Sequence, residues 1–380
     1  MRRTRPALAL SGFGPLILGL SLLGLFAARG GGEEPPPVRQ VEPSSPTHAE
    51  IEARRRERTE LERAVRRHPR DAPLRLELAR LYLDASFESY ASEQLERILA
   101  LDAPDSIEAT ARLELARLRL QDAQLHSDPA RAETAAALFY PTFAAAGSLS
   151  REALLLFARA TLLSVGRRRE DGLRKSEIAR AAVHTVLTAF PDDVDALLLD
   201  GLLALGQGRG RDADLSFRRA IPRLDPEDQA AFGSGEFALA ADPDPTTVEN
   251  EAELERWANL VRADLLYGRP GLRGWQTEAG ALVARFGPPR SVLDDTFAQG
   301  SADMVTSRIF GAEDPSWFRP VAEALPTRSL LYRVGGKEVL FRLEDHSMRG
   351  DWRLSSDSQI RVAALSESLR TMPELRTTAE

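Results

Sequence analysis

Cysteine is absent from this chain of 380 residues. Its absence excludes disulfide bonds, thiolate nucleophiles, cysteine-ligated zinc and the modified cysteine of a lipoprotein signal. Histidine is also scarce, and the five that occur show neither metal-ligand spacing nor a His-Glu-x-x-His pattern: His48, His68, His126, His184 and His346. The sequence therefore predicts no metal site and no cofactor.

An excess of basic charge is missing too. The chain has 50 Lys and Arg against 57 Asp and Glu, a net charge of −7. Proteins that bind nucleic acid usually carry a basic patch or stripe, so nucleic acid is not an expected partner. The glycine-rich loop Gly206–Gly210 follows a helical pattern and not a strand, unlike the loops that bind nucleotide phosphates.

The N-terminus holds the one long apolar run. Residues 6–28 carry no charge and follow the basic segment MRRTR. This run is long for the core of a signal peptide and has about the length of a membrane-spanning helix. We expect residues 1–29 to be either a transmembrane anchor or a signal sequence cleaved near Ala28. Basic residues before the run predict a cytoplasmic N-terminus, with the rest anchored facing the periplasm or exported.

Residues 30–48 are rich in Gly, Pro and Glu and have almost no apolar side chains. Such a segment buries too little apolar surface to fold, so it is predicted to be a disordered linker. The last segment, residues 371–380, is predicted to be a C-terminal tail. These two segments enclose two predicted folded parts, which cover residues 49–230 and 235–370.

Between residues 49 and 230, apolar residues recur at intervals of three and four, which predicts helices. A repeat of about 34 residues is visible. Small residues stand where two helices of a unit would cross closely: Ala79, Ala116, Ala158 and Gly201. The pattern resembles the tetratricopeptide repeat. The resemblance implies an all-α helical solenoid whose concave groove binds a protein or peptide partner.

The residue after each small position is Arg80, Arg117 and Arg159 in the first three units. We expect these arginines to line the groove and to bind an acidic or carboxylate-ended peptide. Leucines stand four positions before them in each unit: Leu76, Leu113 and Leu155. In the alternative interpretation, the arginines are simply solvated on helix faces and the leucines are packed inside.

From residue 235 the pattern changes to a mixture of helix and strand. An amphipathic helix runs through Trp257 to Leu265, and two strand-like runs flank Gly335 and Gly336, which is typical of a hairpin. A short strand and a closing helix follow. The sequence thus predicts a small α+β domain with a mostly antiparallel sheet behind the helical repeats.

Several separated motifs of this part occur in a recognisable order. The residues that carry them are Gly274, Trp275, Thr277, Gly287 and Pro289, followed by Gly350-Asp351-Trp352. Their order resembles the GWxTD domain, a family of bacterial envelope proteins. The sequence departs from the family at Glu278, where Asp is usual, and at Ala279, where a basic residue is common. The resemblance implies a location in the cell envelope, and it names a domain and not a reaction.

We expect the motif to form a structural corner. Trp275 should be buried between the preceding helix and the sheet, and Gly274 should leave room for its ring. Thr277 and Glu278 should bind backbone amides at the start of a strand over residues 281–286.

Two functions are compatible with the sequence. The first is a membrane-tethered envelope scaffold or adaptor that binds its partner through the tetratricopeptide groove, with the GWxTD-like domain as a docking or structural module. The second is an envelope hydrolase, which requires carboxylates of the GWxTD-like domain to converge. The candidates are Glu278, Asp294, Asp295, Asp345 and Asp351. The alternative for these carboxylates is turn formation and capping.

Overall fold

The computed structural model describes residues 48–145, 147–165, 169–233, 250–295, 326–334, 337–346 and 350–371. The predicted anchor or signal sequence (1–29), nearly all of the linker and nearly all of the tail lie outside these ranges. Within them, every helix is too short or too polar to span a bilayer. The chain forms two compact units, Met1–Arg55 and Arg56–Glu380, and the second contains the sheet and every helix after the first.

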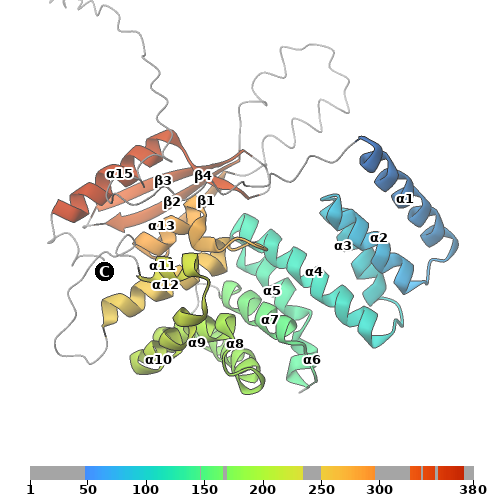
Figure 1. Cartoon of the computed structure of the whole chain (residues 1–380), viewed down its shortest axis with the longest axis horizontal. Helices are drawn as coiled ribbons and strands as arrows, with labels where there is room; N and C mark the ends of the chain where they lie inside the picture. Colours follow the sequence, from blue (N-terminus) through green and yellow to red (C-terminus); the bar gives the residue numbers. More distant parts are fainter. Residues whose placement is uncertain are drawn as a thin grey trace, which may run out of the picture. The chain divides into compact units, whose positions relative to one another are not determined.

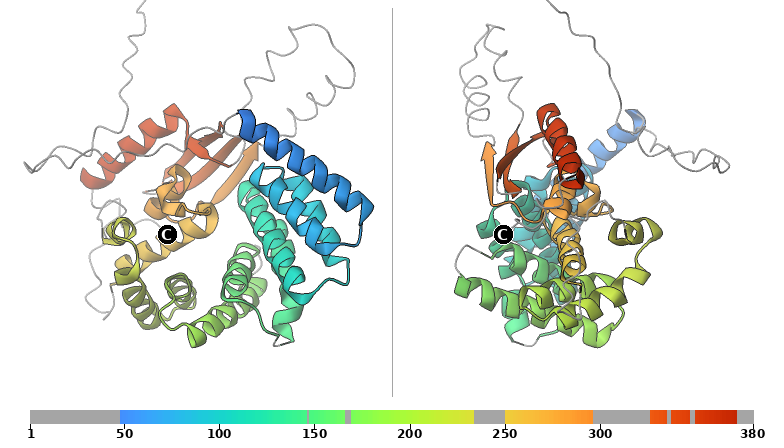
Figure 2. Two further views of the ribbon diagram at one scale, coloured as in Figure 1. Left: turned by 45° about the vertical axis from the view of Figure 1, so that its right-hand side comes forward. Right: turned by 90° about the vertical axis from the view of Figure 1, so that its left-hand side faces the viewer.

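The first part of the chain is helical, as predicted. Helices from α2 to α10 each pack on a neighbour in chain order (Figures 1 and 2). We call the segment from α2 to α11 the helical half. The helices are α1 (His48–Arg67), α2 (Ala72–Asp84), α3 (Glu88–Leu99), α4 (Asp105–His126), α5 (Pro129–Ala137), α6 (Tyr140–Ala144), α7 (Arg151–Leu163), α8 (Arg169–Ala189), α9 (Val194–Gly206), α10 (Gly210–Ala220), the 3₁₀ turn η2 (Ile221–Arg223) and α11 (Pro226–Gly233).

Local sequence explains where these helices begin and how closely they pack. The side chains of Asp71 and Asp193 accept backbone N–H groups in the first turns of α2 and α9, which satisfies donors that a helix leaves free. The predicted small positions are closely packed, since Ala79, Ala116 and Ala158 are fully buried. A Cβ atom on Gly201 would lie 2.6 Å from the ring of Phe217, so a larger residue would force α9 and α10 apart.

The rest of the chain, which we call the C-terminal half, combines helices with one sheet. Its elements are α12 (Glu251–Tyr267), the 3₁₀ turn η4 (Gly274–Gln276), α13 (Glu278–Phe286), β1 (Ser291–Asp295), β2 (Thr327–Val334), β3 (Lys337–Asp345), β4 (Trp352–Leu354) and α15 (Ser356–Thr371). The four strands pair antiparallel in the order β1-β2-β3-β4. The predicted hairpin is confirmed by the pairing of Val334 with Lys337. The predicted short strand and closing helix are β4 and α15.

One prediction for this half is wrong. Residues 281–286 belong to the helix α13 and not to a strand. The apolar residues of this stretch explain the difference, because Ala279, Leu282, Val283 and Phe286 recur at intervals of three and four and form one face of a helix. Phe286 packs against Tyr332 and Phe341 of the sheet, with ring centroids 5.7 and 5.6 Å away. Thus α13 covers one face of the sheet.

Helix α12 joins the two halves. It packs on α13 on one side and on α9 and α10 on the other (Figure 1). Its Trp257 meets Phe217 of α10 edge to face, with ring centroids 5.8 Å apart. A single cluster of buried apolar side chains runs from Ala116 in α4 to Trp352 in β4. Because this core is continuous and closely packed, the surfaces of the two halves that face each other are held in fixed positions.

Candidate functional site

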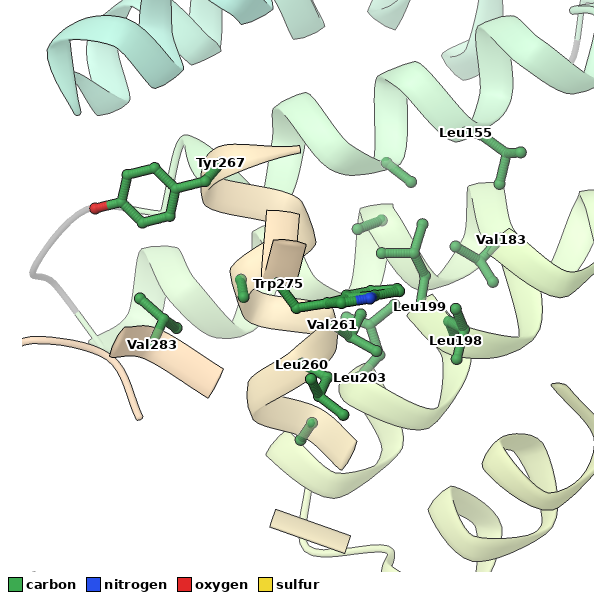
Figure 3. Close-up of a cluster of buried hydrophobic side chains, with 14 of the residues drawn as sticks. Leu155, Val183, Leu198, Leu199, Leu203, Leu260, Val261, Tyr267, Trp275 and Val283 are labelled. Atoms are coloured by element: carbon green, nitrogen blue, oxygen red, sulfur yellow. The ribbon is translucent and has the colours of Figure 1, made fainter. Parts of the chain in front are cut away.

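Trp275 is buried as expected, but its surroundings differ from the prediction. Its indole N–H donates to Asp228 Oδ1 of α11 at 3.1 Å, and its ring meets Phe232 edge to face at 5.5 Å. Figure 3 shows the indole next to Leu199 and Val261. The ring therefore lies between α12 and the helical half, and not between α12 and the sheet. It fastens the C-terminal half to the helices.

Gly274 is needed for a reason other than the predicted one. A Cβ atom at this position would overlap the backbone carbonyl of Ala263 in α12, so glycine allows the turn to approach the helix backbone. The same close approach lets the Gly274 N–H donate to Asp264 Oδ1 at 2.9 Å. The room that glycine leaves is thus for α12 and not for the indole ring.

The other motif residues bind backbone groups. Thr277 Oγ1 accepts the Gly280 N–H at 3.0 Å and caps α13, while Glu278 accepts the Leu354 N–H of β4 at 2.6 Å. Gly287 ends α13 with a φ of 77°, a conformation that favours glycine, and Pro289 lies in the turn before β1. The prediction that both residues bind amides of this turn is confirmed for Thr277, although the element that follows is a helix. It is wrong for Glu278, which binds an amide of β4 instead.

A cleft of about 1050 Å³ opens between the helical half and the segment that leads into the motif. Helices α2, α4, α7, α9 and α11 supply one side, and residues 264–276 supply the other. Its charged and polar lining includes Glu114, Arg117, Gln121, Glu152, Arg159, Asp195, Asp225, Glu227, Asp228, Asp264, Arg269 and Arg273. Its size is that of a site for a small ligand or a short peptide segment.

The predicted groove residues are brought together only in part. Arg117 and Arg159 line the cleft, whereas Arg80 is exposed outside it. Leu76 and Leu155 are buried in the core, and Leu113 packs against it. The leucines therefore follow the alternative interpretation, in which they serve packing.

Arg117 and Arg159 already bind carboxylates of the chain. Arg159 forms an ion pair with Asp264 of α12, and Arg117 forms ion pairs with Glu114 and Glu152. These contacts occupy the guanidinium groups that were expected to hold an acidic partner.

A third arginine, which sequence reasoning missed, connects both halves. Arg273 Nη1 lies 2.9 Å from Asp195 Oδ1 of α9, and Arg273 Nε lies 3.4 Å from Asp228 Oδ2 of α11. Burial raises the pKa of Asp195, but the guanidinium groups of Arg273, Arg159 and Arg151 lower it by more, so its pKa lies below the usual value. Asp195 is therefore ionised at neutral pH. One feature of the sequence points to these ion pairs. Asp264 is a carboxylate on the apolar face of α12, and a carboxylate in that position needs a cationic partner.

Four of the five carboxylates proposed for hydrolysis have structural partners, and the partner of Glu278 is the Leu354 N–H given above. Asp294 binds Arg328 at 2.6 Å, and the buried Asp345 accepts the Gly350 N–H at 2.6 Å. Asp351 lies 3.1 Å from Arg353, and Asp295 stands in β1 opposite Thr327. Within the described ranges, no group of His, Asp and Glu is arranged to hold a metal ion. Asp345 fits the turn-forming alternative, because it accepts a backbone N–H five residues further on, whereas Asp294 and Asp351 form ion pairs that this alternative did not include.

Comparisons with known proteins assign no family. No family model matches the chain, and no curated protein matches its sequence. Among solved structures, the crystal structure of MamA matches with 16% identity over 49% of this chain and 98% of that chain, at a TM-score of 0.33. A crystal structure of MamA protein matches with 18% identity over 51% of this chain and 91% of that chain, also at 0.33. Likeness at this level assigns neither a family nor a function.

Proposed function

We propose that the protein is a membrane-tethered scaffold of the cell envelope that binds a segment of a partner protein in the cleft between its two halves. The observation that carries this proposal is the cleft of about 1050 Å³ itself. Most of the helices that line it, α4, α7, α9, α11 and α12, contribute side chains to one continuous core. A site whose walls are already ordered loses little conformational entropy when a ligand binds, which favours recognition of a flexible peptide.

In this proposal the C-terminal half is a structural module that completes the site. The Gly268–Gln276 segment forms one wall, and Trp275 and Arg273 hold that wall against α9 and α11. The tether and the envelope location rest on the apolar run of residues 6–28 and on the resemblance of the C-terminal half to the GWxTD domain. Tetratricopeptide-like helices supply the opposite wall.

A library of random octapeptides displayed on phage tests the proposal. The library is selected on residues 48–380, and the enriched peptides are measured against two variants. Gln121→Trp places a large side chain in the cleft from an exposed position of α4. Thr188→Trp adds the same ring at an exposed position of α8 that does not line the cleft, and it serves as the matched control.

We expect the enriched peptides to bind the wild type and the control equally and to lose at least about tenfold in affinity for Gln121→Trp, because the added ring occupies their volume. Circular dichroism melting checks that both variants are folded. Enrichment of peptides that bind all three proteins alike would place the binding surface elsewhere and contradict the proposal.

A further inference from the structure

The charge of the cleft deepens the proposed function, on which this inference rests. Seven carboxylates line the cleft against four guanidinium groups. One of the four, Arg269, has its Nη2 atom 3.4 Å from where a Cβ of Gly350 would stand and forms no ion pair with these carboxylates within the described residues. The carboxylates that line the cleft therefore outnumber its arginines.

The ion pairs inside the cleft do not neutralise all of its carboxylates. Five carboxylates share the guanidinium groups of Arg117, Arg159 and Arg273, and Arg151 adds a contact to Asp195 at 3.6 Å from outside the lining. Two more carboxylates, Asp225 and Glu227, are exposed at the start of α11, and no ion pair involves them within the described residues.

An acidic ligand would have to displace the chain's own carboxylates from the arginines. Those carboxylates are tethered next to their partners, so they compete at a high effective concentration. Displacement from Arg159 would also take the nearest cation away from the carboxylate of Asp264, whose side chain is only 11% exposed, and leave it with the more distant Arg273 at 3.6 Å. A cationic ligand meets no such competition at Asp225 and Glu227, whose exposed carboxylates form no ion pair within the described residues.

We propose that the cleft takes a segment rich in lysine or arginine, whose positive groups bind the exposed carboxylates that line it, Asp225 and Glu227. This is the reverse of the acidic partner that the row of arginines predicts from the sequence. Apolar side chains also line the cleft, for example Leu118 and Leu156. They supply contacts for the aliphatic stems of lysine and arginine.

The net charge of the peptides selected on the wild type tests whether the cleft prefers a basic segment. Only those peptides that lose affinity for Gln121→Trp are scored for net charge. We expect them to carry a positive net charge. We also expect their affinity to fall as salt is raised from 50 to 300 mM, because the Debye length falls below about 10 Å above 0.1 M and exposed charge contacts are then screened. Cleft-dependent peptides with a negative net charge would overturn the inference and leave the proposed function intact.

A pair of charge variants gives an independent test. Asp225→Asn with Glu227→Gln should weaken the cleft-dependent peptides on the order of tenfold, in proportion to two lost charge contacts. The control, Glu88→Gln with Asp105→Asn, removes the same charge from exposed first-turn positions of α3 and α4 outside the cleft. Equal weakening by both pairs would show attraction to net charge only and would contradict a site at α11. If no selected peptide depends on the cleft, the proposed function itself fails.

Discussion

Arg328 of β2 donates a hydrogen bond of 2.6 Å from Nη2 to the carbonyl of Leu125, near the end of α4. The same guanidinium binds Asp294 of β1 and lies over the ring of Trp352, 4.4 Å from its centroid. Arg328 is fully buried. A cation near a helix C-terminus complements the helix dipole, so this one side chain ties the sheet to the helical half at a second place, apart from Trp275.

Arg328→Met should therefore be strongly destabilising. The substitution leaves Asp294 without its partner and should lower the free energy of unfolding by about 3–5 kcal/mol. Denaturant unfolding followed by circular dichroism measures the loss. Combining it with Asp294→Asn should recover part of the stability, because the uncompensated charge is then gone. Arg353→Met, at an exposed pair with Asp351, is the control and should change stability by less than about 1 kcal/mol.

Gly274→Ala should destabilise the protein although it adds only one methyl group. The added Cβ would overlap the backbone of Ala263, which cannot move without shifting α12. We expect a loss of about 1–3 kcal/mol, typical of overpacking. Gly206→Ala at the end of α9 is the matched control, since nothing lies within 4 Å of its Cβ position. A melting temperature for Gly274→Ala equal to that of the control would show that the turn and α12 separate easily.

Much of the fold follows from local sequence. Spacing at three and four predicts the repeat helices, and the small residues at Ala79 and Gly201 mark close helix crossings that the structure contains. The hairpin follows from its glycine pair and flanking strands. The strand predicted over residues 281–286 is wrong because a short apolar run fits a strand or a buried helix equally well. The N-cap at Thr277 is the local signal that favours the helix.

The cleft was beyond sequence reasoning for a different reason. Its walls come from segments far apart in the chain, for example Arg117 and Arg273, and their proximity depends on how α12 packs on α9. The spacing of Arg80, Arg117 and Arg159 predicts a shared surface. It does not predict that Asp264 of α12 forms an ion pair with Arg159. Asp264 on the apolar face of α12 indicated a buried partner without naming it.

Trp275→Ala should weaken both halves together. Truncating a buried tryptophan costs about 3–5 kcal/mol, and here the lost contacts include Phe232 and Asp228 of α11. We expect amide hydrogen exchange to accelerate in α9 and α12 alike, because the ring lies between them (Figure 3). Trp275→Phe keeps most of the packing and loses the Asp228 bond, so its effect should be smaller. A protease-resistant helical fragment that ends near residue 235 and exchanges as in the wild type would contradict a shared core.

The ion pair between Arg273 and Asp195 should show itself in the dependence of stability on pH. Burial by itself raises the pKa of Asp195, and Arg273 is the main group that lowers it below the usual value. A carboxyl with a lowered pKa in the folded state stabilises that state above its unfolded pKa, about 3.9, and this contribution is lost as pH falls through the folded pKa.

The Arg273→Gln variant should therefore be less stable than the wild type at pH 7. The difference should hold down to about pH 5 and then narrow below pH 4, as Asp195 becomes protonated in both proteins. Urea unfolding at a series of pH values between 3 and 7 measures the difference in free energy of unfolding.

The control is Arg353→Gln at the exposed pair with Asp351. Its free energy of unfolding should differ little from that of the wild type at any of these pH values. A gap for Arg273→Gln that stays constant down to pH 3 would mean that Arg273 stabilises the cleft by packing, for example over the Trp275 ring at 5.5 Å, and not through the carboxylates.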